Sequence, residues 1–141
     1  LVRRNLEEYV FLLGRHPLES MPSFYAASDA LLVTLKDSPA FSMTIPGKVQ
    51  SYMAAEKPIL TMLSGEGSRV VEEAGCGFVA DAGDYEQLID NIEKMIRLSC
   101  EDLNVLANNA KTYAHNEFDR DKLISQLEGW FVDLSTQRKG D

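Results

Sequence analysis

The sequence predicts an α/β fold in which a parallel sheet of about four strands carries helices on both faces and a helical tail follows. Short apolar runs of strand length alternate with longer amphipathic stretches, an order typical of strand–helix–strand units. Glycine and proline separate these stretches, as at Gly14 and Pro58. The chain has 141 residues, a length that fits one domain.

Four apolar runs are expected to be the strands, at residues 9–13, 30–35, 58–62 and 77–80. Continuous apolar runs are typical of strands that are buried on both faces of a parallel sheet. Four such strands with helices between them form a doubly wound, Rossmann-like sheet.

Local signals mark where the helices begin and end. They are N-terminal prolines, a C-terminal glycine cap and two capping boxes, at Pro22, Pro46, Gly75, Asp84–Gln87 and Ser99–Asp102. The expected helices are residues 1–8 (the tail of a helix), 21–27, 46–56, 68–74, 85–96, 100–117 and about 120–136. Because the sheet then opens on a helix tail, we expect at least one further strand–helix unit upstream.

Composition and charge exclude several classes of protein. The chain is 45% hydrophobic and 26% charged, as in ordinary globular proteins. Its net charge of −8 repels phosphate polymers, so no nucleic acid partner is expected. Cys76 and Cys100 lie outside any zinc-binding pattern, and reduced thiols in a cytoplasmic protein are expected. No membrane span or signal peptide is visible, and the first residue, Leu1, suggests a chain that begins inside a longer reading frame.

The strongest candidate for a binding site is the loop of residues 36–45 and the helix that follows it. Ligands of open α/β sheets bind beyond the carboxyl ends of the strands, where this loop lies. A helix N-terminus offers free N–H groups and a partial positive charge. Gly47 allows close approach to the backbone, and Lys48 and Ser51 share one side of the helix. The pattern predicts an anion site at residues 44–51 that suits a diphosphate with an attached ribose.

Each of these residues also has an ordinary structural interpretation. Proline and glycine begin many helices without a ligand, and lysine is usually a solvated surface residue. Glu66 is either an acid that favours the helix dipole or a ligand contact. His16 is either a surface loop residue or a side chain that stacks on a base. Spacing alone supports no catalytic triad, carboxylate pair or metal cluster.

Four stretches of the sequence carry a family resemblance, at residues 9–33, 44–60, 65–84 and 115–131. In this order they resemble the C-terminal domain of family-4 GT-B glycosyltransferases. The closest resemblance is to the bacterial polysaccharide and lipopolysaccharide branch, which shows a P-x-K-x-x-x-Y-x-A-x-x-K-P segment, here residues 46–58. In that family a C-terminal Rossmann-like domain binds the nucleotide-diphospho-sugar and an N-terminal domain binds the acceptor. Retaining transfer there uses no metal, so we expect no cofactor.

The resemblance extends to single residues only in part. It implies that backbone amides near Thr44 meet the sugar and phosphate, and that Lys48 favours the phosphates. Ser51 lies where many members place a glutamate that holds the ribose, and Met43 lies where they place another. Glu56 replaces the glycine that is usual before Lys57 and Pro58.

Three further residues are expected to contact the donor. Arg15 and His16, in the loop after the first run, resemble the region that lines the nucleotide base. Glu66 lies in the glycine turn that precedes a helix. We therefore expect the donor-binding set Thr44, Gly47, Lys48, Ser51, Arg15, His16 and Glu66, while the catalytic residues stay unassigned.

The resemblance implies a nucleotide-sugar donor-binding domain at residues 1–118, incomplete at its N-terminal end, and a C-terminal helix at 119–141. That helix would cross to an acceptor domain absent from this chain, so its apolar face should re-dock on this domain or drive self-association. Because basic residues that hold the diphosphate come from the start of such domains, we expect this chain alone to be inactive. The parent protein would transfer sugars to a glycan or lipid-linked acceptor in cell-surface polysaccharide synthesis, at the inner face of the membrane.

Two alternatives remain open from the residues alone. One is a non-catalytic α/β interaction domain, to which Met43, Ser51 and Glu56 would point. The other is a nucleotide-sugar epimerase of similar two-domain fold, for which His16 and His115 look too scattered.

Overall fold

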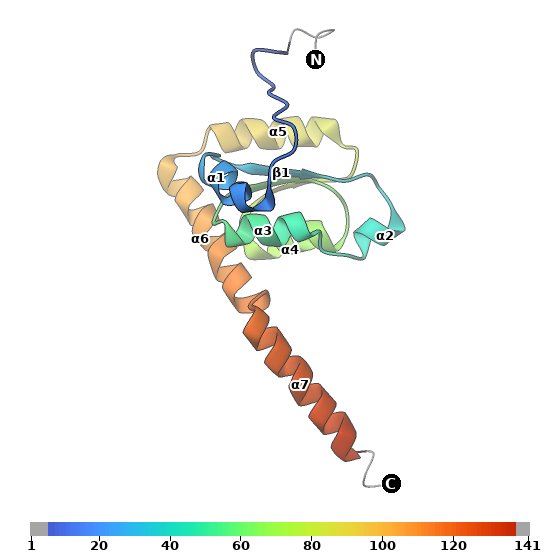
Figure 1. The fold of residues 1–141 in the computed structure, drawn as a ribbon. Coiled ribbons are helices and arrows are strands. Elements are labelled where there is room, and N and C mark those ends of the chain that lie inside the picture. Colours follow the sequence, from blue (N-terminus) through green and yellow to red (C-terminus); the bar gives the residue numbers. More distant parts are fainter. Residues whose placement is uncertain (1–5, 138–141) are drawn as a thin grey trace.

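Three parallel strands form one sheet in the computed structural model, which describes residues 6–137 (Figure 1). The strands are β1 (Leu31–Thr34), β2 (Ile59–Met62) and β3 (Gly77–Ala80), in the spatial order β1-β2-β3. Leu31 is paired with Ile59, which in turn is paired with Gly77. The α/β class and the last three predicted strands are therefore confirmed.

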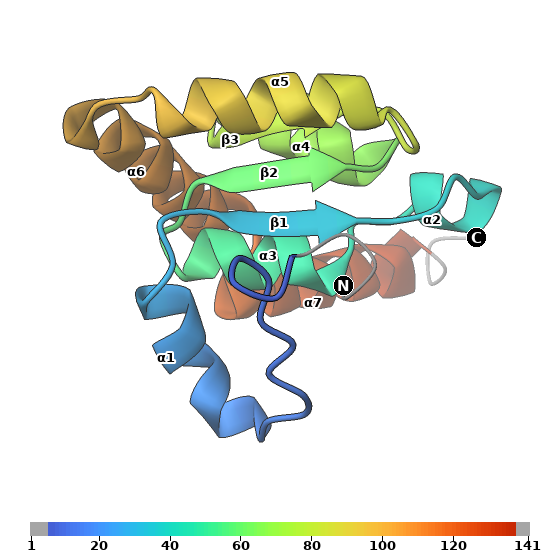
Figure 2. The same cartoon turned by 90° about the horizontal axis from the view of Figure 1, so that it is seen from above.

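Helices cover both faces of this sheet, as expected (Figure 1; Figure 2 gives the view from above). Helices α3 (Gly47–Ala54) and α4 (Glu66–Ala74) lie on one face, and α5 (Tyr85–Ile96) lies on the other. Apolar side chains of the sheet, α3, α4 and α6 (Cys100–Glu117) meet in one buried cluster. Its members are Val33, Val49, Met53, Ile59, Leu63, Val70, Val71, Cys76 and Ala110.

The first predicted strand, Tyr9–Leu13, is wrong, and the described sheet has three strands instead of about four. These five side chains are exposed, Leu12 by 82%. A strand exists only where a neighbouring strand pairs with its backbone groups. The described sheet, of order β1-β2-β3, pairs none of these residues, so the apolar run has no neighbouring strand within residues 6–137.

The predicted helix tail at residues 1–8 is not supported where it can be assessed. Residues 1–5 lie outside the described part of the chain. Leu6 begins a turn, because its carbonyl oxygen accepts hydrogen bonds from the amides of Tyr9 and Val10 at 3.1 and 2.9 Å.

The other helices begin and end close to the predicted residues, because local capping determines their ends. Gly75 ends α4 in the left-handed conformation, with φ of 59°. Ser99 and Asp102 form the predicted capping box of α6. Asp84 accepts a hydrogen bond from the Gln87 amide at 2.9 Å, but the Gln87 side chain turns to the amide of Asp81 instead of closing the box.

Two short elements were not predicted, η2 (Leu18–Ser20) before α1 (Met21–Ala26), and α2 (Pro39–Ser42) within the long loop after β1. One helical turn is too short to show apolar periodicity, so sequence patterns miss such elements.

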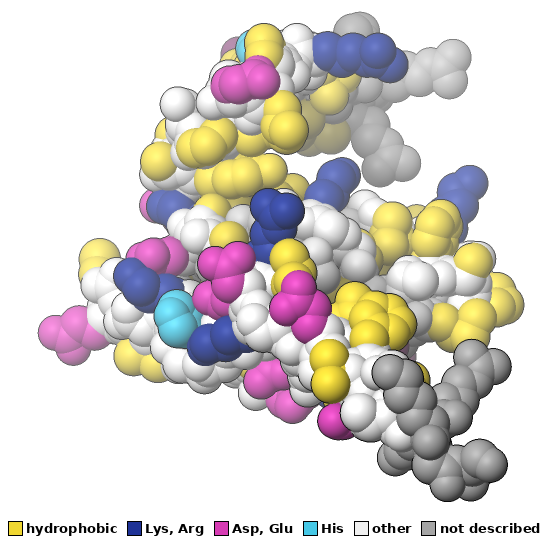
Figure 3. All heavy atoms as spheres, turned by 60° about the horizontal axis from the view of Figure 1, so that its bottom comes forward, with side chains coloured by type: hydrophobic (Ala, Val, Ile, Leu, Met, Phe, Trp, Pro, Cys, Tyr) yellow, Lys and Arg dark blue, Asp and Glu magenta, His cyan; other side chains and the backbone are white. Residues whose placement is uncertain are grey.

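The last helix, α7 (Arg120–Gln137), projects away from the sheet (Figure 1). Its apolar side chains, such as Trp130, Phe131 and Leu134, are 56–62% exposed. The space-filling view shows apolar side chains at the surface along the part of the molecule that leads to the C-terminus (Figure 3). The helix is therefore not docked on this domain, which was one of the two expected outcomes. Its apolar face is exposed, as the other outcome requires. None of the helices within residues 6–137 is both long and apolar enough to cross a bilayer.

Candidate functional site

The candidate site lies at the carboxyl edge of the sheet, where the three strands end at Thr34, Met62 and Ala80. The arrows of β1 and β2 both end on the side of the molecule where α2 lies (Figure 2). Helices α3 and α4 each follow a strand, and their N-termini face this edge. Ligands of open α/β sheets bind in this place.

The N-terminus of α3 offers free backbone donors. Pro46 is the N-cap in an extended conformation, and its carbonyl oxygen accepts the amide of Val49 at 2.9 Å. Within residues 6–137, the amides of Gly47 and Lys48 form no hydrogen bond. Lys48 is exposed and has no ion-pair partner among these residues. Two free amide donors and an exposed lysine therefore belong to the first turn of α3, where the helix dipole is positive.

A second helix N-terminus lies against the first. Gly65, the N-cap of α4, has φ of 90°, and a Cβ there would overlap the carbonyl oxygen of Ser42. A Cβ on Gly67 would lie 2.8 Å from the Pro46 ring. The glycines of this turn therefore allow α4 to pack closely on the chain that leads into α3. The sequence pattern predicted only a turn with Glu66 here, and this packing role of the two glycines was not predicted.

Thr44 and Ser51 are at the helix start in sequence, but their hydroxyl groups are already engaged. The Thr44 hydroxyl donates to the carbonyl oxygens of Ala40 and Phe41 at 3.2 and 3.3 Å. The Ser51 hydroxyl donates to the Gly47 carbonyl oxygen at 2.9 Å, and Ser51 lines a groove between α1 and α3 that also contains Tyr25. Neither hydroxyl needs a ligand for its hydrogen bond.

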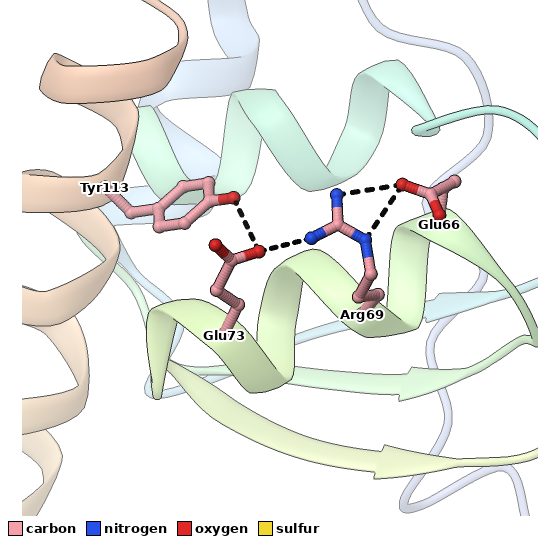
Figure 4. Close-up of polar contacts among 4 residues, drawn as sticks. All are labelled: Glu66, Arg69, Glu73 and Tyr113. Atoms are coloured by element: carbon pink, nitrogen blue, oxygen red, sulfur yellow. Dashed lines mark hydrogen bonds and ion pairs between the residues drawn. The ribbon is translucent and has the colours of Figure 1, made fainter.

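Glu66 belongs to a charged network on the surface of α4 (Figure 4). Its carboxylate accepts two bonds from Arg69, at 2.8 and 2.9 Å, and Arg69 also pairs with Glu73, which accepts a bond from the Tyr113 hydroxyl at 3.3 Å. The hydrogen bond and charge of Glu66 raise the pKa of Arg69. Burial, followed by the Glu73 charge, raises the pKa of Tyr113. The charge of Arg69 is thus neutralised by two carboxylates. Lys48, which has no ion-pair partner within residues 6–137, is therefore the basic residue that could attract an anion to the start of α3.

The loop that contains Arg15 and His16 is not joined to this edge by any hydrogen bond within the described range. The His16 ring packs on Phe24 with centroids 4.7 Å apart, and its Nε2 lies 3.0 Å from the carbonyl oxygen of Leu13. In Figure 2 the segment that leads into α1 lies beside α1, while α2 lies at the opposite end of β1. The predicted base contact remains a prediction.

A cleft of about 400 Å³ at the carboxyl end of β1 was not predicted. Three strand ends contribute to it, and its lining includes Thr34, Lys36, Asp37, Met62, Gly83 and Tyr85. Lys36 directly follows the predicted strand of residues 30–35, and this position could have indicated a site at the strand end. Tyr85 could not be placed there, because only the sheet brings the loop after β3 and the end of β1 to the same cleft.

The arrangement can bind an anion by backbone amides and a lysine, and stabilise negative charge that develops on it. Within residues 6–137 no group of three His, Cys, Asp or Glu side chains could hold a metal ion.

Comparison with known proteins identifies a family and a relative of this chain. Residues 1–97 match the family model described as Glycosyl transferases group 1. The chain is also 31% identical over 107 residues to the Probable glycosyltransferase WbjE of Pseudomonas aeruginosa. That alignment covers 74% of this chain and 26% of the relative, so the chain spans about a quarter of the protein that it matches.

Proposed function

Because the chain belongs to the glycosyl transferases group 1 family, we propose that it forms the nucleotide-sugar-binding part of a glycosyltransferase. The chain spans only part of its relative, so the activity of the whole protein is included in the proposal. Membership of the family also favours transfer over the epimerase alternative.

The observation that carries the proposal is the contact between the N-termini of α3 and α4. The amides of Gly47 and Lys48 are free within residues 6–137, and Gly65 and Gly67 bring the α4 terminus against Ser42 and Pro46. Each helix N-terminus carries a partial positive charge of roughly +0.5. Two such termini and Lys48 suit a diphosphate, whose negative charge increases when the sugar leaves. Groups already in place there stabilise the transition state without reorganisation.

The finer parts of the proposal come from the resemblance to family-4 GT-B enzymes. The donor is a nucleotide-diphospho-sugar, and transfer retains the configuration of the sugar without a metal. The acceptor is a glycan or a lipid-linked sugar, in cell-surface polysaccharide synthesis at the inner face of the membrane. An N-terminal domain of the parent protein would bind that acceptor, and this chain alone would bind the donor weakly without transferring it.

Titration of the chain with UDP or GDP, followed by NMR, tests the site. The amides of Gly47, Lys48 and residues 64–67 should shift, and so should those of residues 14–16 if the base lies there. Lys48→Ala should weaken binding by about fivefold, because a cation beside the site contributes up to about 1 kcal/mol. Lys94→Ala, on the far helix α5, is the matched control and should leave binding unchanged.

Three outcomes would count against parts of the proposal. Shifts that avoid the helix N-termini, or no shifts at all, would contradict the assigned site. Micromolar binding of a UDP-sugar together with sugar transfer would contradict the expected inactivity of the chain alone. Unchanged activity of the parent protein with Lys48→Ala would favour a non-catalytic interaction domain.

A further inference from the structure

We propose that the cleft at the carboxyl end of β1 is a subsite for a neutral sugar ring, in which Asp37 and Thr34 hold hydroxyl groups and Tyr85 packs on the ring. The inference rests on the proposed function for the class of ligand, and it adds residues that lie outside the donor-binding set. The cleft measures about 400 Å³, within the range of roughly 300–1,000 Å³ found for small-molecule sites.

The lining of the cleft offers hydrogen-bonding groups that have no partner among the described residues. Thr34, Lys36 and Asp37 follow one another closely at the end of β1, and their side chains are exposed. Within residues 6–137, none of these three side chains forms a hydrogen bond or ion pair with another residue. A carboxylate accepts bonds from two donors, a hydroxyl both donates and accepts, and an ammonium group only donates. Together they match the hydroxyl groups of a sugar, each of which is both donor and acceptor.

The charge of the lining favours a neutral ligand over a phosphate. The lining contains one ammonium group, Lys36, and one carboxylate, Asp37, so its formal charge is zero. A diphosphate would meet repulsion from Asp37 and prefers the helix N-termini, where no carboxylate other than the paired Glu66 lies in the first turns. A neutral polyhydroxylated ring has no such conflict. The two places at this edge therefore suit different parts of a sugar phosphate.

An aromatic side chain, Tyr85, also lines the cleft. Tyr85 is 66% exposed and stands at the first position of α5. An exposed aromatic ring beside free hydrogen-bonding groups suits a ligand with one apolar face and polar edges, as a pyranose ring has.

The loop that carries Tyr85 is fixed in place before any ligand arrives. The Ala82 amide donates to the Ser64 hydroxyl at 3.1 Å, and the Asp81 amide donates to the Gln87 side chain at 3.2 Å. The Tyr85 amide donates to the Gly83 carbonyl oxygen at 3.1 Å. A preformed wall lowers the entropy that binding must overcome.

The same chemistry could come from the sugar of the donor or from a sugar of the acceptor, and the probes separate these sources. The chain is titrated with UDP, with UDP-glucose, and with the methyl α-glycosides of glucose, galactose, mannose and N-acetylglucosamine at millimolar concentration. The amides of residues 34–37 and 82–85 are followed by NMR. A donor sugar predicts that UDP-glucose shifts them and UDP does not. An acceptor sugar predicts that a glycoside shifts them while UDP-glucose behaves like UDP.

Variants test the assigned side chains with the probe that binds. Asp37→Asn should weaken the sugar-dependent affinity by about tenfold, because bonds to a charged group are strong, while binding of UDP alone stays unchanged. Glu86→Gln, an exposed acid of the same helix as Tyr85 that does not line the cleft, is its control. Tyr85→Ala should weaken the same affinity, and Tyr9→Ala, another exposed tyrosine, should not.

The result separates this inference from the proposed function. Shifts in the cleft with a sugar, without shifts at Gly47 and Lys48 with UDP or GDP, would support the sugar subsite and reject the nucleotide site. Nucleotide binding without any cleft shift from UDP-glucose or the four glycosides would overturn the sugar subsite alone. Unchanged sugar affinity in both Asp37→Asn and Tyr85→Ala would overturn it as well.

Discussion

The carboxylate of Glu56, just beyond the end of α3, forms an ion pair with Lys111 of α6, and Oε1 and Nζ are 2.8 Å apart. Glu56 has φ of 56° and is the only non-glycine residue with positive φ in the described part of the chain. In the family that the sequence resembles, a glycine is usual at this position. The structure shows why a glycine suits the position, and it shows that the glutamate links α3 to α6 instead.

Glu56→Gly should raise the free energy of unfolding by about 0.5–1 kcal/mol. A residue with a Cβ costs roughly 1–2 kcal/mol in the left-handed conformation, whereas an exposed ion pair contributes about 0–1 kcal/mol. The added freedom of glycine in the unfolded chain offsets part of the gain. Urea unfolding measures the change. Lys111→Ala, which removes the pair but keeps the strain, should lower stability by less than about 1 kcal/mol. A Glu56→Gly variant less stable than Lys111→Ala would contradict this explanation.

Stability should fall at high pH because of Cys76. The Cys76 side chain is buried, and burial raises the pKa of its thiol from 9.0 to about 11. A raised pKa means that the unfolded chain loses this proton first. The contribution is therefore fully present below pH 9.0 and is lost as the pH rises to about 11. This rise in the pKa, from 9.0 to about 11, corresponds to about 2–3 kcal/mol in the free energy of unfolding.

Urea unfolding of the wild type and of Cys76→Ala across this pH range isolates the effect from other titrating groups. The variant should lose less stability than the wild type as the pH rises. Cys100→Ala, in which the removed thiol is exposed, should behave like the wild type. Equal pH dependence in the wild type and Cys76→Ala would show that the buried thiol is not responsible.

Gly65→Ala should both destabilise the fold and weaken nucleotide binding. The new methyl group would overlap the Ser42 carbonyl oxygen in a backbone conformation that favours glycine. We expect a loss of about 2–3 kcal/mol in unfolding free energy and smaller UDP-induced shifts at Gly47 and Lys48. Gly129→Ala is the matched control, because a Cβ there meets no atom within 4 Å and alanine is favoured in helices by about 1 kcal/mol. Wild-type stability and wild-type UDP shifts in Gly65→Ala would contradict the close packing of the two termini.

The chain should self-associate through α7. Leu127, Trp130 and Leu134 recur at helical spacing and are 45–61% exposed, and an apolar stripe of this kind on a lone helix is typical of an interaction surface. Sedimentation should show a concentration-dependent increase in mass, with a blue shift of Trp130 fluorescence. Leu127→Glu should restore the monomer, while Thr136→Glu, at a polar position of the same helix, should not. A monomer at all concentrations with a solvated Trp130 would rule this out.

Local patterns predicted most of the helices and strands, and the reason is visible in particular residues. Gly75, Ser99 and Asp102 act within one turn of the chain, so their caps formed as expected. Tyr9–Leu13 failed because a strand exists only beside another strand, and the apolar run says nothing about its neighbour. The α3 terminus was predicted because helix dipole and free amides follow from chain order alone.

The sequence by itself therefore determined the α/β class, three strands, the helices that follow them and a helix start with free amides at Gly47 and Lys48. Only the tertiary structure decided that the α4 terminus lies against Pro46, that Arg69 is paired with Glu66 and Glu73, and that Tyr85 and Thr34 line one cleft. Caps and dipoles are properties of residues a few positions apart. Contacts between strand ends depend on the order of strands in the sheet, which no local stretch of sequence contains.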